Sequence, residues 1–450
     1  MFQFKEKILG LSEFSKNVIT LMTGTMLAQA LPIAISPILT RLYSPDDFGV
    51  FALFMSITSI FGAIITARYE LSIMLPKSNS DAANLVVLSL SIAFSLSIML
   101  LIVVFVFNDQ IVSFLGNTDL KNWLYFIPLS VLLTGVYQSL NYWSNRNKKY
   151  KRLASAKVIQ SSMKGGANTG FGFLNIGAIG LIFGTIIGQL FSTLLLFFLV
   201  KKNNNNFFEN VSINRMKQLA KKYEKFVKYD LPASISYSLY SNMAVVFFNK
   251  FFESAISGFY FFANRLLKVP FSFFINAFSD VFYQKISTTT DLNIISKEVN
   301  NYSTKLLKFT IIPFLLIVYN SYFYVGFVFG DEWVDLWKYM YIFSLPIYIA
   351  LILSPYGHVL KVVNRQEVSM FLHFSRLLII GGYFISYFFI EYDFIWFLFI
   401  FSILEASIHI LLCFFVDKII QNKKTSTNLV FRVIVLVFIL FINYNSVLNK

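Results

Sequence analysis

Long apolar runs separated by short polar breaks dominate this chain. About 20 apolar residues in a helix are enough to cross the hydrocarbon core of a bilayer. On this basis the sequence predicts twelve helical spans, at 17–39, 48–75, 82–107, 122–143, 153–174, 178–200, 229–252, 257–281, 304–329, 337–359, 367–389 and 394–416. A further apolar run at 429–444 is short and carries Arg432, so it is only a candidate for a thirteenth span. The pattern predicts an all-α polytopic membrane protein.

The charges in the connecting segments orient these spans. With a cytoplasmic N-terminus, the segments on the cytoplasmic side hold 25 Lys and Arg residues, whereas those outside hold only Arg41 and Lys121. Such a bias follows the rule that basic loops stay on the cytoplasmic side. We therefore expect a multi-pass membrane protein with its N-terminus on the cytoplasmic side.

The composition agrees with a polytopic membrane protein and narrows the kinds of ligand that the chain is expected to bind. The chain is 56% hydrophobic, contains 53 Phe and has only 14% charged residues. Its net charge of +15 is explained by cytoplasmic loops, so it does not indicate nucleic-acid binding. The single Cys413 and three scattered histidines provide no metal-ligand cluster. We expect no metal and no cofactor.

Two pairs of short matches indicate an internal repeat. In the first pair, Arg41 and Lys250 each precede a glycine by eight residues, with an acidic residue between them. In the second pair, Asn145-Arg146 precedes Lys157 and Asn364-Arg365 precedes Arg376 at the same spacing. The matches predict two six-helix halves in parallel orientation, an arrangement that places substrate near the membrane midplane. The expected parts are 1–200, a basic cytoplasmic linker at 201–228, 229–416, and a tail at 417–450.

Cations inside the apolar spans are the main candidates for a binding site. They are Arg265 and Lys268 on the eighth span, Lys157 and Lys164 on the fifth, and Arg376 on the eleventh. A charge at the bilayer centre costs at least about 2.5–3.5 kcal/mol, so such residues generally face a protected interior. A central basic cavity between the halves suits an anionic substrate, and Arg and Lys are natural partners of phosphate. For Lys157 and Arg376, extension of the side chain to the cytoplasmic surface is an equal alternative.

Acidic residues within the spans are fewer. Glu405 and His409 are four residues apart on the twelfth span, which makes them candidates for coupling to a proton or sodium ion. Arg68 and Glu70 near the inner end of the second span are expected to form a structural ion pair. Small and polar residues between Asn17 and Gln29 on the first span fit either a cavity lining or a tight helix crossing.

Catalytic motifs are missing from the sequence. It has no glycine-rich phosphate loop and no paired aspartates for Mg²⁺, so we expect a protein that is not an enzyme. The expected external segments are also short, the longest running from 108 to 121. A membrane polymerase or ligase of surface glycan assembly would need a larger external loop for its acceptor.

Several segments resemble those of a known family. Arg41-Leu-Tyr-Ser-Pro-Asp-Asp-Phe-Gly-Val-Phe51 and Ala67-Arg-Tyr-Glu-Leu-Ser-Ile-Met-Leu-Pro76 are similar to the polysaccharide-biosynthesis (Wzx-type, O-antigen or capsule) flippases of the multidrug/oligosaccharidyl-lipid/polysaccharide exporter superfamily. Ala263-Asn-Arg-Leu-Leu-Lys-Val-Pro270 resembles a segment shared with lipid II flippases. The sequence departs from lipid II flippases in lacking fourteen spans and their basic-acidic pair in the first span.

The resemblance implies that the protein moves an undecaprenyl-diphosphate-linked oligosaccharide from the inner to the outer leaflet of a bacterial cytoplasmic (inner) membrane. It assigns Arg265 to the diphosphate, and it makes membrane lipids and the polymerase and chain-length regulator of the same pathway the expected partners. A multidrug cation antiporter of the same fold remains an alternative. Acidic residues would be expected to line the interior of such an antiporter, whereas here the buried charges are mostly basic.

Overall fold

The computed structural model describes residues 13–203, 211–287, 289, 291–354, 356–363 and 365–420. Every regular element in these ranges is helical, which confirms the all-α prediction. Each of the twelve predicted spans corresponds to one helix or to one helix interrupted by a break. The candidate span at 429–444 lies outside the described residues.

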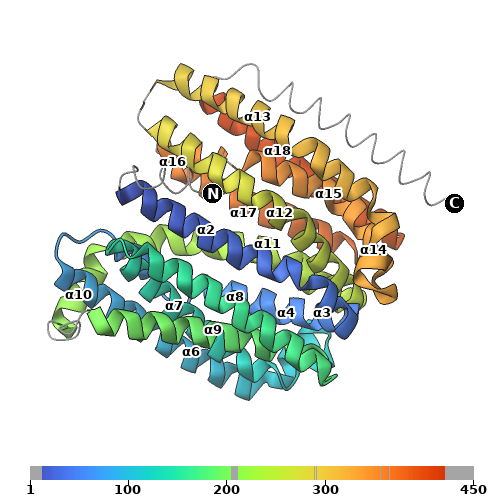
Figure 1. The fold of residues 1–450 in the computed structure, drawn as a ribbon, viewed down its shortest axis with the longest axis horizontal. Helices are drawn as coiled ribbons and strands as arrows, with labels where there is room; N and C mark the ends of the chain where they lie inside the picture. Colours follow the sequence, from blue (N-terminus) through green and yellow to red (C-terminus); the bar gives the residue numbers. More distant parts are fainter. Residues whose placement is uncertain are drawn as a thin grey trace, which may run out of the picture. The chain divides into compact units, whose positions relative to one another are not determined.

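Contacts divide the described chain into a first unit that ends at Gly258 and a second unit that begins at Phe259 (Figure 1). The predicted six-helix halves are defined by sequence repeats rather than by contacts, and they stay a prediction. The first unit contains α2 (Glu13–Ala34), α3 (Ser36–Leu42), α4 (Pro45–Gly62), α5 (Tyr69–Ser72), α6 (Asn79–Leu115), α7 (Ile127–Arg146), α8 (Tyr150–Phe173), α9 (Ala178–Asn203), α10 (Ile213–Lys222), α11 (Leu231–Phe251) and the start of α12 (Ser254–Ser287). Short 3-10 turns at Thr118–Leu120 and Leu124–Phe126 and a π turn at Phe226–Asp230 lie between them.

Within the first unit, α8 packs between α2 and α9, α7 contacts α6 and α9, and α11 packs along α4. The bundle explains the sequence pattern, because each helix needs apolar or small residues on its packed sides. Gly24 of α2 shows how close this packing becomes. A Cβ at Gly24 would lie only 2.5 Å from the Cβ of Ala154, so α2 and α8 meet in a tight crossing.

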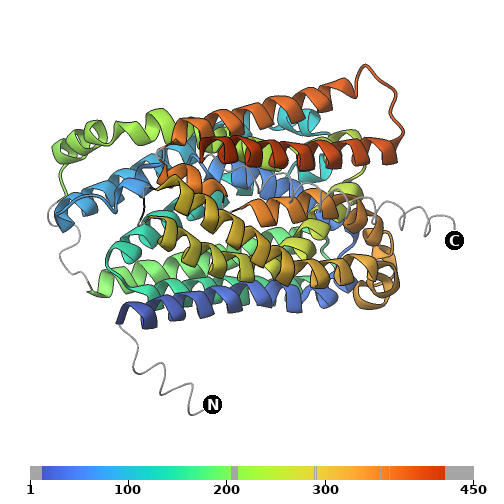
Figure 2. The same ribbon diagram turned by 90° about the horizontal axis from the view of Figure 1, so that it is seen from above.

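The second unit contains the rest of α12, followed by α13 (Leu292–Tyr319), α14 (Ser321–Phe329), a 3-10 turn at Asp331–Trp333, α15 (Leu336–Leu353), α16 (Tyr356–Val362), α17 (Gln366–Ser386) and α18 (Phe394–Ile419). In this unit α15 packs against α13 and α18, and α17 packs against α18 (Figure 2). Aromatic contacts fill the interior, such as the stacked rings of Phe259 and Tyr339, whose centroids are 4.9 Å apart. The many Phe residues are therefore partly a packing feature.

Judged by length and composition alone, six of the described helical segments are long and apolar enough to cross a membrane. They are Thr20–Leu42, Asn79–Leu115, Ala178–Lys202, Leu292–Tyr319, Leu336–Leu360 and Phe394–Ile419. The remaining predicted spans include α8 and α12, which carry the candidate cations, and α17, whose apolar part is shorter. These helices are polar because of the residues that make them candidates for function, and they need the surrounding bundle to be stable in a bilayer.

The second predicted span differs from its expected shape. The sequence predicted one helix over 48–75, but α4 ends at Gly62, and Ala67 and Arg68 have positive φ values of 47° and 64°. Two consecutive non-glycine residues in this region are unfavourable and interrupt the helix. The chain resumes as the short helix α5, so the prediction of one continuous helix was wrong here.

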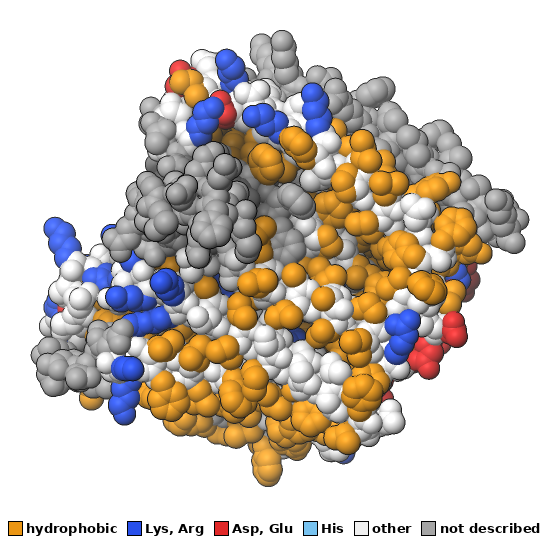
Figure 3. Space-filling view, viewed as in Figure 1, with side chains coloured by type: hydrophobic (Ala, Val, Ile, Leu, Met, Phe, Trp, Pro, Cys, Tyr) orange, Lys and Arg blue, Asp and Glu red, His pale blue; other side chains and the backbone are white. Residues whose placement is uncertain are grey.

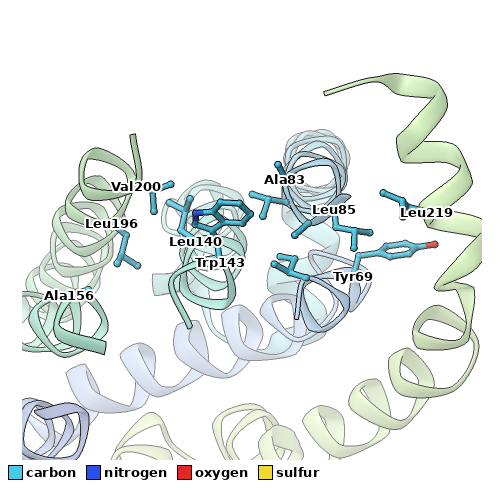
Figure 4. Close-up of a cluster of buried hydrophobic side chains, with 12 residues drawn as sticks. Tyr69, Ala83, Leu85, Leu140, Trp143, Ala156, Leu196, Val200 and Leu219 are labelled. Atoms are coloured by element: carbon cyan, nitrogen blue, oxygen red, sulfur yellow. The ribbon is translucent and has the colours of Figure 1, made fainter. Parts of the chain in front are cut away.

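A cluster of buried side chains holds this interruption in place at the end of the first unit where α10 lies. Trp143 of α7, which is 3% exposed, lies at its centre, with Tyr69, Leu85, Leu196 and other residues around it (Figure 4). Leu219 of α10 is 1% exposed and joins the same cluster. The apolar side of α10 is thus buried against the helical bundle.

Replacing Trp143 with alanine is expected to lower the free energy of unfolding by about 3–5 kcal/mol, because it opens a large cavity in a packed interior. The melting midpoint can be followed with a thiol-reactive dye, since Cys413 is 1% exposed and becomes reactive only on unfolding. Trp396→Ala is the control, because Trp396 is 60% exposed. Equal midpoints for the two variants would contradict the central role of Trp143.

Candidate functional site

The two candidate lysines of α8 contact different neighbouring helices. Lys157 Nζ donates a hydrogen bond of 3.1 Å to Thr25 Oγ1 on α2. Lys164 Nζ lies 5.0 Å from the centre of the Phe51 ring on α4, within range of a cation–π interaction. Both side chains are half-buried. They are held inside the first unit by specific contacts.

An open groove of about 560 Å³ lies along the contact of α2 and α8. It is lined by hydroxyl and small apolar side chains, namely Thr20, Thr23, Gly24, Ala154, Ser155, Val158 and Ile159. Ser161 also donates a hydrogen bond to the backbone oxygen of Ala28 across this seam. The polar face predicted for the first span therefore makes both a tight crossing and a groove lining.

Arg265 and Lys268 lie on the long helix α12, three residues apart and so on one side of it. Arg265 is eleven residues beyond Ser254, which at 1.5 Å per residue places it about 16 Å along the helix. That is about half the thickness of the hydrocarbon core. Arg265 is half-buried and Lys268 is exposed.

A group of ionisable residues gathers in the second unit from three helices. Lys268 of α12 interacts electrostatically with Glu405 of α18. His409 of α18 is within electrostatic range of Arg376 and His373 of α17 and of Lys268. The group thus combines two cationic side chains and two histidines with one carboxylate. We name Lys268, His373, Arg376, Glu405 and His409 the basic cluster.

The structure places Arg376 and His409 differently from what their spacing in the sequence suggests. Arg376 is only 6% exposed and lies ten residues into α17, about 15 Å from the start of the helix, so its side chain does not reach a surface. His409 Nδ1 lies 2.8 Å from the backbone oxygen of Glu405, which acts as the acceptor. The contact between Glu405 and His409 therefore runs through the backbone oxygen of Glu405. The carboxylate of Glu405 interacts electrostatically with Lys268 instead.

His373 belongs to the same group, although the sequence pattern did not single it out. It lies three residues before Arg376 on α17, and Arg376 acts electrostatically on it. The same spacing argument that pairs Arg265 with Lys268 would have identified it.

Arg68 and Glu70 lie at the interruption after α4. Arg68 Nη1 is 3.3 Å from Glu70 Oε1, and the Glu70 side chain is 2% exposed. Thr66 donates a hydrogen bond to the same carboxylate. These contacts lie directly beside the positive-φ residues Ala67 and Arg68.

The linker helix α10 is docked at this end of the first unit by polar contacts as well. Arg215 donates to both oxygens of Asp81 at 2.7 and 2.8 Å, and the Ser212 backbone N–H donates to Asn84 Oδ1 at 2.9 Å. Tyr69 donates to the backbone oxygen of Ala220 at 3.1 Å. Figure 3 shows Lys and Arg side chains gathered at the end of the unit that carries α10. The basic side of α10 therefore remains exposed.

The Asp81–Arg215 contact is expected to persist at neutral pH and to be lost only in strong acid. The hydrogen bond from Arg215 lowers the pKa of Asp81 below its ordinary value of 3.8. A lowered pKa stabilises the docked form above pH 3.8, and the effect disappears as the pH falls through the pKa of the folded state. Spin labels at Lys77→Cys and Lys217→Cys in a Cys413→Ala background measure this distance. A Lys228→Gln variant, which breaks an exposed bridge at 2.8 Å within the neighbouring segment, should leave the distance unchanged.

Comparison with known proteins identifies the family. The model of the family described as "Polysaccharide biosynthesis protein" matches residues 38–338. No curated protein matches the chain in a sequence search.

Solved structures show the same fold at low sequence identity. The chain is similar to the lipid II flippase MurJ in an inward closed conformation, with 15% identity, 97% of this chain and 99% of that chain covered, and a TM-score of 0.64. It is also similar to a transporter of the MOP superfamily from Pyrococcus furiosus, with 15% identity, 91% and 97% coverage, and a TM-score of 0.61. An outward-facing multidrug resistance MATE transporter matches with 15% identity, the same coverage and a TM-score of 0.60. The chain therefore belongs to the polysaccharide biosynthesis protein family and is a multi-pass membrane protein with the helical fold of MOP superfamily transporters.

Proposed function

We propose that the protein moves an undecaprenyl-diphosphate-linked oligosaccharide, of the kind used for O-antigen or capsule, from the inner to the outer leaflet of the bacterial cytoplasmic membrane. The N-terminus is cytoplasmic in this proposal, as the charge bias of the loops indicates. The observation that carries it is the basic cluster of the second unit, near the middle of helices that cross the membrane. A diphosphate is the most costly part of such a lipid to move through hydrocarbon.

The basic groups lower this cost in a simple way. Arg forms paired hydrogen bonds to phosphate oxygens, and Lys neutralises them as a point charge. Arg265 lies one helical turn from Lys268, so a diphosphate at this turn of α12 contacts both residues in our proposal. Lys157 and Lys164 of α8 are separate candidates for contact with phosphate, within the first unit, and the lipid chain stays in the bilayer.

Glu405 is assigned a second role in this proposal. It neutralises Lys268 when no substrate is present, and an arriving diphosphate competes with it for the lysine. Protonation of Glu405, with His409 and Arg376 nearby, would release Lys268 to the phosphate and couple transport to protons. This places the candidate coupling residues and the candidate phosphate ligands in one cluster.

The sign of the charges favours an anionic substrate over a cationic drug. The α12 turn and α17 carry three cationic side chains, Arg265, Lys268 and Arg376. His373 and His409 lie on α17 and α18, and Glu405 is the one carboxylate of the basic cluster. A binding site for cationic drugs would require the opposite balance.

The function is tested with purified protein in liposomes that contain a fluorescent undecaprenyl-diphosphate oligosaccharide. Accessibility of the sugar to an external glycosidase reports its movement between leaflets. We expect movement with this lipid and none with a neutral dolichol-like alcohol that carries the same sugars. Efflux of ethidium by the same vesicles, without movement of the lipid, would instead establish the cation antiporter.

The proposed coupling through Glu405 predicts a change in pH dependence. Glu405→Gln removes the carboxylate while keeping its size, so the transport rate should vary less with pH between acidic and neutral conditions. Movement of the lipid should continue, because the phosphate ligands are intact. A pH profile identical to that of the unmodified protein would exclude Glu405 as the coupling residue. Glu391→Gln, at an exposed position before α18, is the control.

A further inference from the structure

Two segments far apart in the sequence cross where α4 and α12 begin. A Cβ atom at Gly49 would lie 1.8 Å from the backbone oxygen of Ser254. A Cβ atom at Gly258 would lie 2.0 Å from the backbone oxygen of Pro45. Real Cβ contacts are essentially never shorter than 3.0 Å, so both positions require glycine. Backbone touches backbone at this crossing, and we call it the glycine crossing.

The contacts of the glycine crossing are reciprocal. Gly49 and Gly258 each lie four residues after the first residue of their helix, and each meets the first residue of the other helix. A spacing of 209 residues relates Gly49 to Gly258 and Pro45 to Ser254. Such an exchange of contacts is the signature of two equivalent segments that meet on a two-fold axis. The segments that carry the first sequence match are therefore in contact with each other.

Buried amides reinforce the glycine crossing. Asn117 Nδ2 donates to Asn249 Oδ1 at 3.0 Å and to Ser254 Oγ at 2.9 Å. Asn249 and Asn117 are only 3% and 6% exposed. Gly116, with a φ of 72°, ends α6 and lets Asn117 approach, because a Cβ at Gly116 would lie 3.1 Å from Lys250. Three segments that the charge pattern places outside the membrane meet here.

The glycine crossing brings the two helix ends into close contact through interactions that are weak enough to break. Direct backbone contact at Gly49 and Gly258 leaves little space between the helix ends. The amides of Asn117 and Asn249 can bond to water when the helices part, so each hydrogen bond contributes only about 0.5–1.5 kcal/mol to the closed form. A contact made of interdigitated aromatic side chains would be much harder to open.

We propose that the glycine crossing is the external closure of the transporter and that it separates each time the protein opens outward. The inference rests on the proposed function, since alternating access needs a closure on each side of the membrane. It assigns Gly49, Gly258, Asn117 and Asn249 to the control of opening rather than to substrate binding.

Cross-linking tests the proposal directly. In a Cys413→Ala background, Asn117→Cys and Asn249→Cys are joined with a short, reducible bifunctional thiol reagent. We expect loss of lipid movement to the level of protein-free vesicles, and recovery on reduction. The control pair is Ser130→Cys with Gln189→Cys, which replaces a bond of 2.8 Å between α7 and α9 of the same unit. Full transport by the protein cross-linked at the crossing would overturn the proposal.

A labelling experiment separates this inference from the proposed substrate. A cysteine at position 249, in the Asn249→Cys single variant, should react with a membrane-impermeant maleimide from outside whenever the crossing opens. Gly49→Ala should raise this rate several-fold, because its added methyl group prevents closure, whereas Gly382→Ala should not, because nothing lies within 4 Å of that position. If the cysteine reacts no faster than the buried native Cys413, the crossing does not open. Opening without movement of the lipid would reject the substrate and retain the closure.

Discussion

Replacing Arg265 with alanine is expected to reduce movement of a diphosphate-linked lipid by about 10- to 150-fold, because hydrogen bonds to charged groups contribute about 1.5–3 kcal/mol. Arg265 lies near the middle of α12, and in our proposal no other side chain of this turn offers phosphate paired hydrogen bonds. Arg265→Lys keeps the charge but loses the paired geometry, so it should retain part of the activity. The assay is lipid movement in liposomes, with surface glycan in a deletion strain as the second measurement.

The matched control lies on the same helix. Lys285 of α12 forms a bridge of 2.7 Å to Glu298, and its side chain is 60% exposed. Lys285→Gln should therefore leave transport unchanged. Full activity of Arg265→Ala at an equal amount of folded protein would remove Arg265 from the site. Loss of activity in both variants would point instead to a general sensitivity of α12.

Replacing Glu70 with alanine should produce the largest loss of stability among the ionic residues. The substitution leaves Arg68 without its carboxylate partner in a mostly buried position. Removing one partner of a buried pair costs about 3–5 kcal/mol. The Arg68 side chain is 25% exposed and so partly reached by solvent, and we expect about 2–4 kcal/mol here. The melting midpoint is read from the reactivity of Cys413.

A double substitution distinguishes the ion pair from the shape of the site. Arg68→Met together with Glu70→Gln removes both charges and keeps an acceptor for Thr66, so stability should largely return. The exposed pair of Lys121 and Asp109 is the comparison, with side chains 55% and 78% exposed. Asp109→Ala should shift the midpoint very little. A double variant that is as unstable as Glu70→Ala would contradict the assigned ionic role.

The length and hydropathy of the apolar runs predicted twelve spans, and a helix or an interrupted helix lies at each of them. This succeeds because a chain in a bilayer must satisfy its backbone hydrogen bonds locally, which makes each span readable from its own residues. The interruption after Gly62 was not predicted. Beside it, Tyr69, Trp143 and Leu219 form one buried cluster, and these residues lie on separate helices that only folding brings together.

The candidate site residues also show what the sequence determines and what only folding determines. The sequence by itself determined that Arg265, Lys268 and Arg376 lie within apolar helices, because charge and hydropathy are properties of single positions. Only the tertiary structure placed Lys268 beside Glu405 and brought His373, Arg376 and His409 together. Likewise, Gly49 and Gly258 were visible as matching positions, but their mutual contact depends on two helices crossing. Local physics sets where a helix runs, whereas packing decides which distant residues meet.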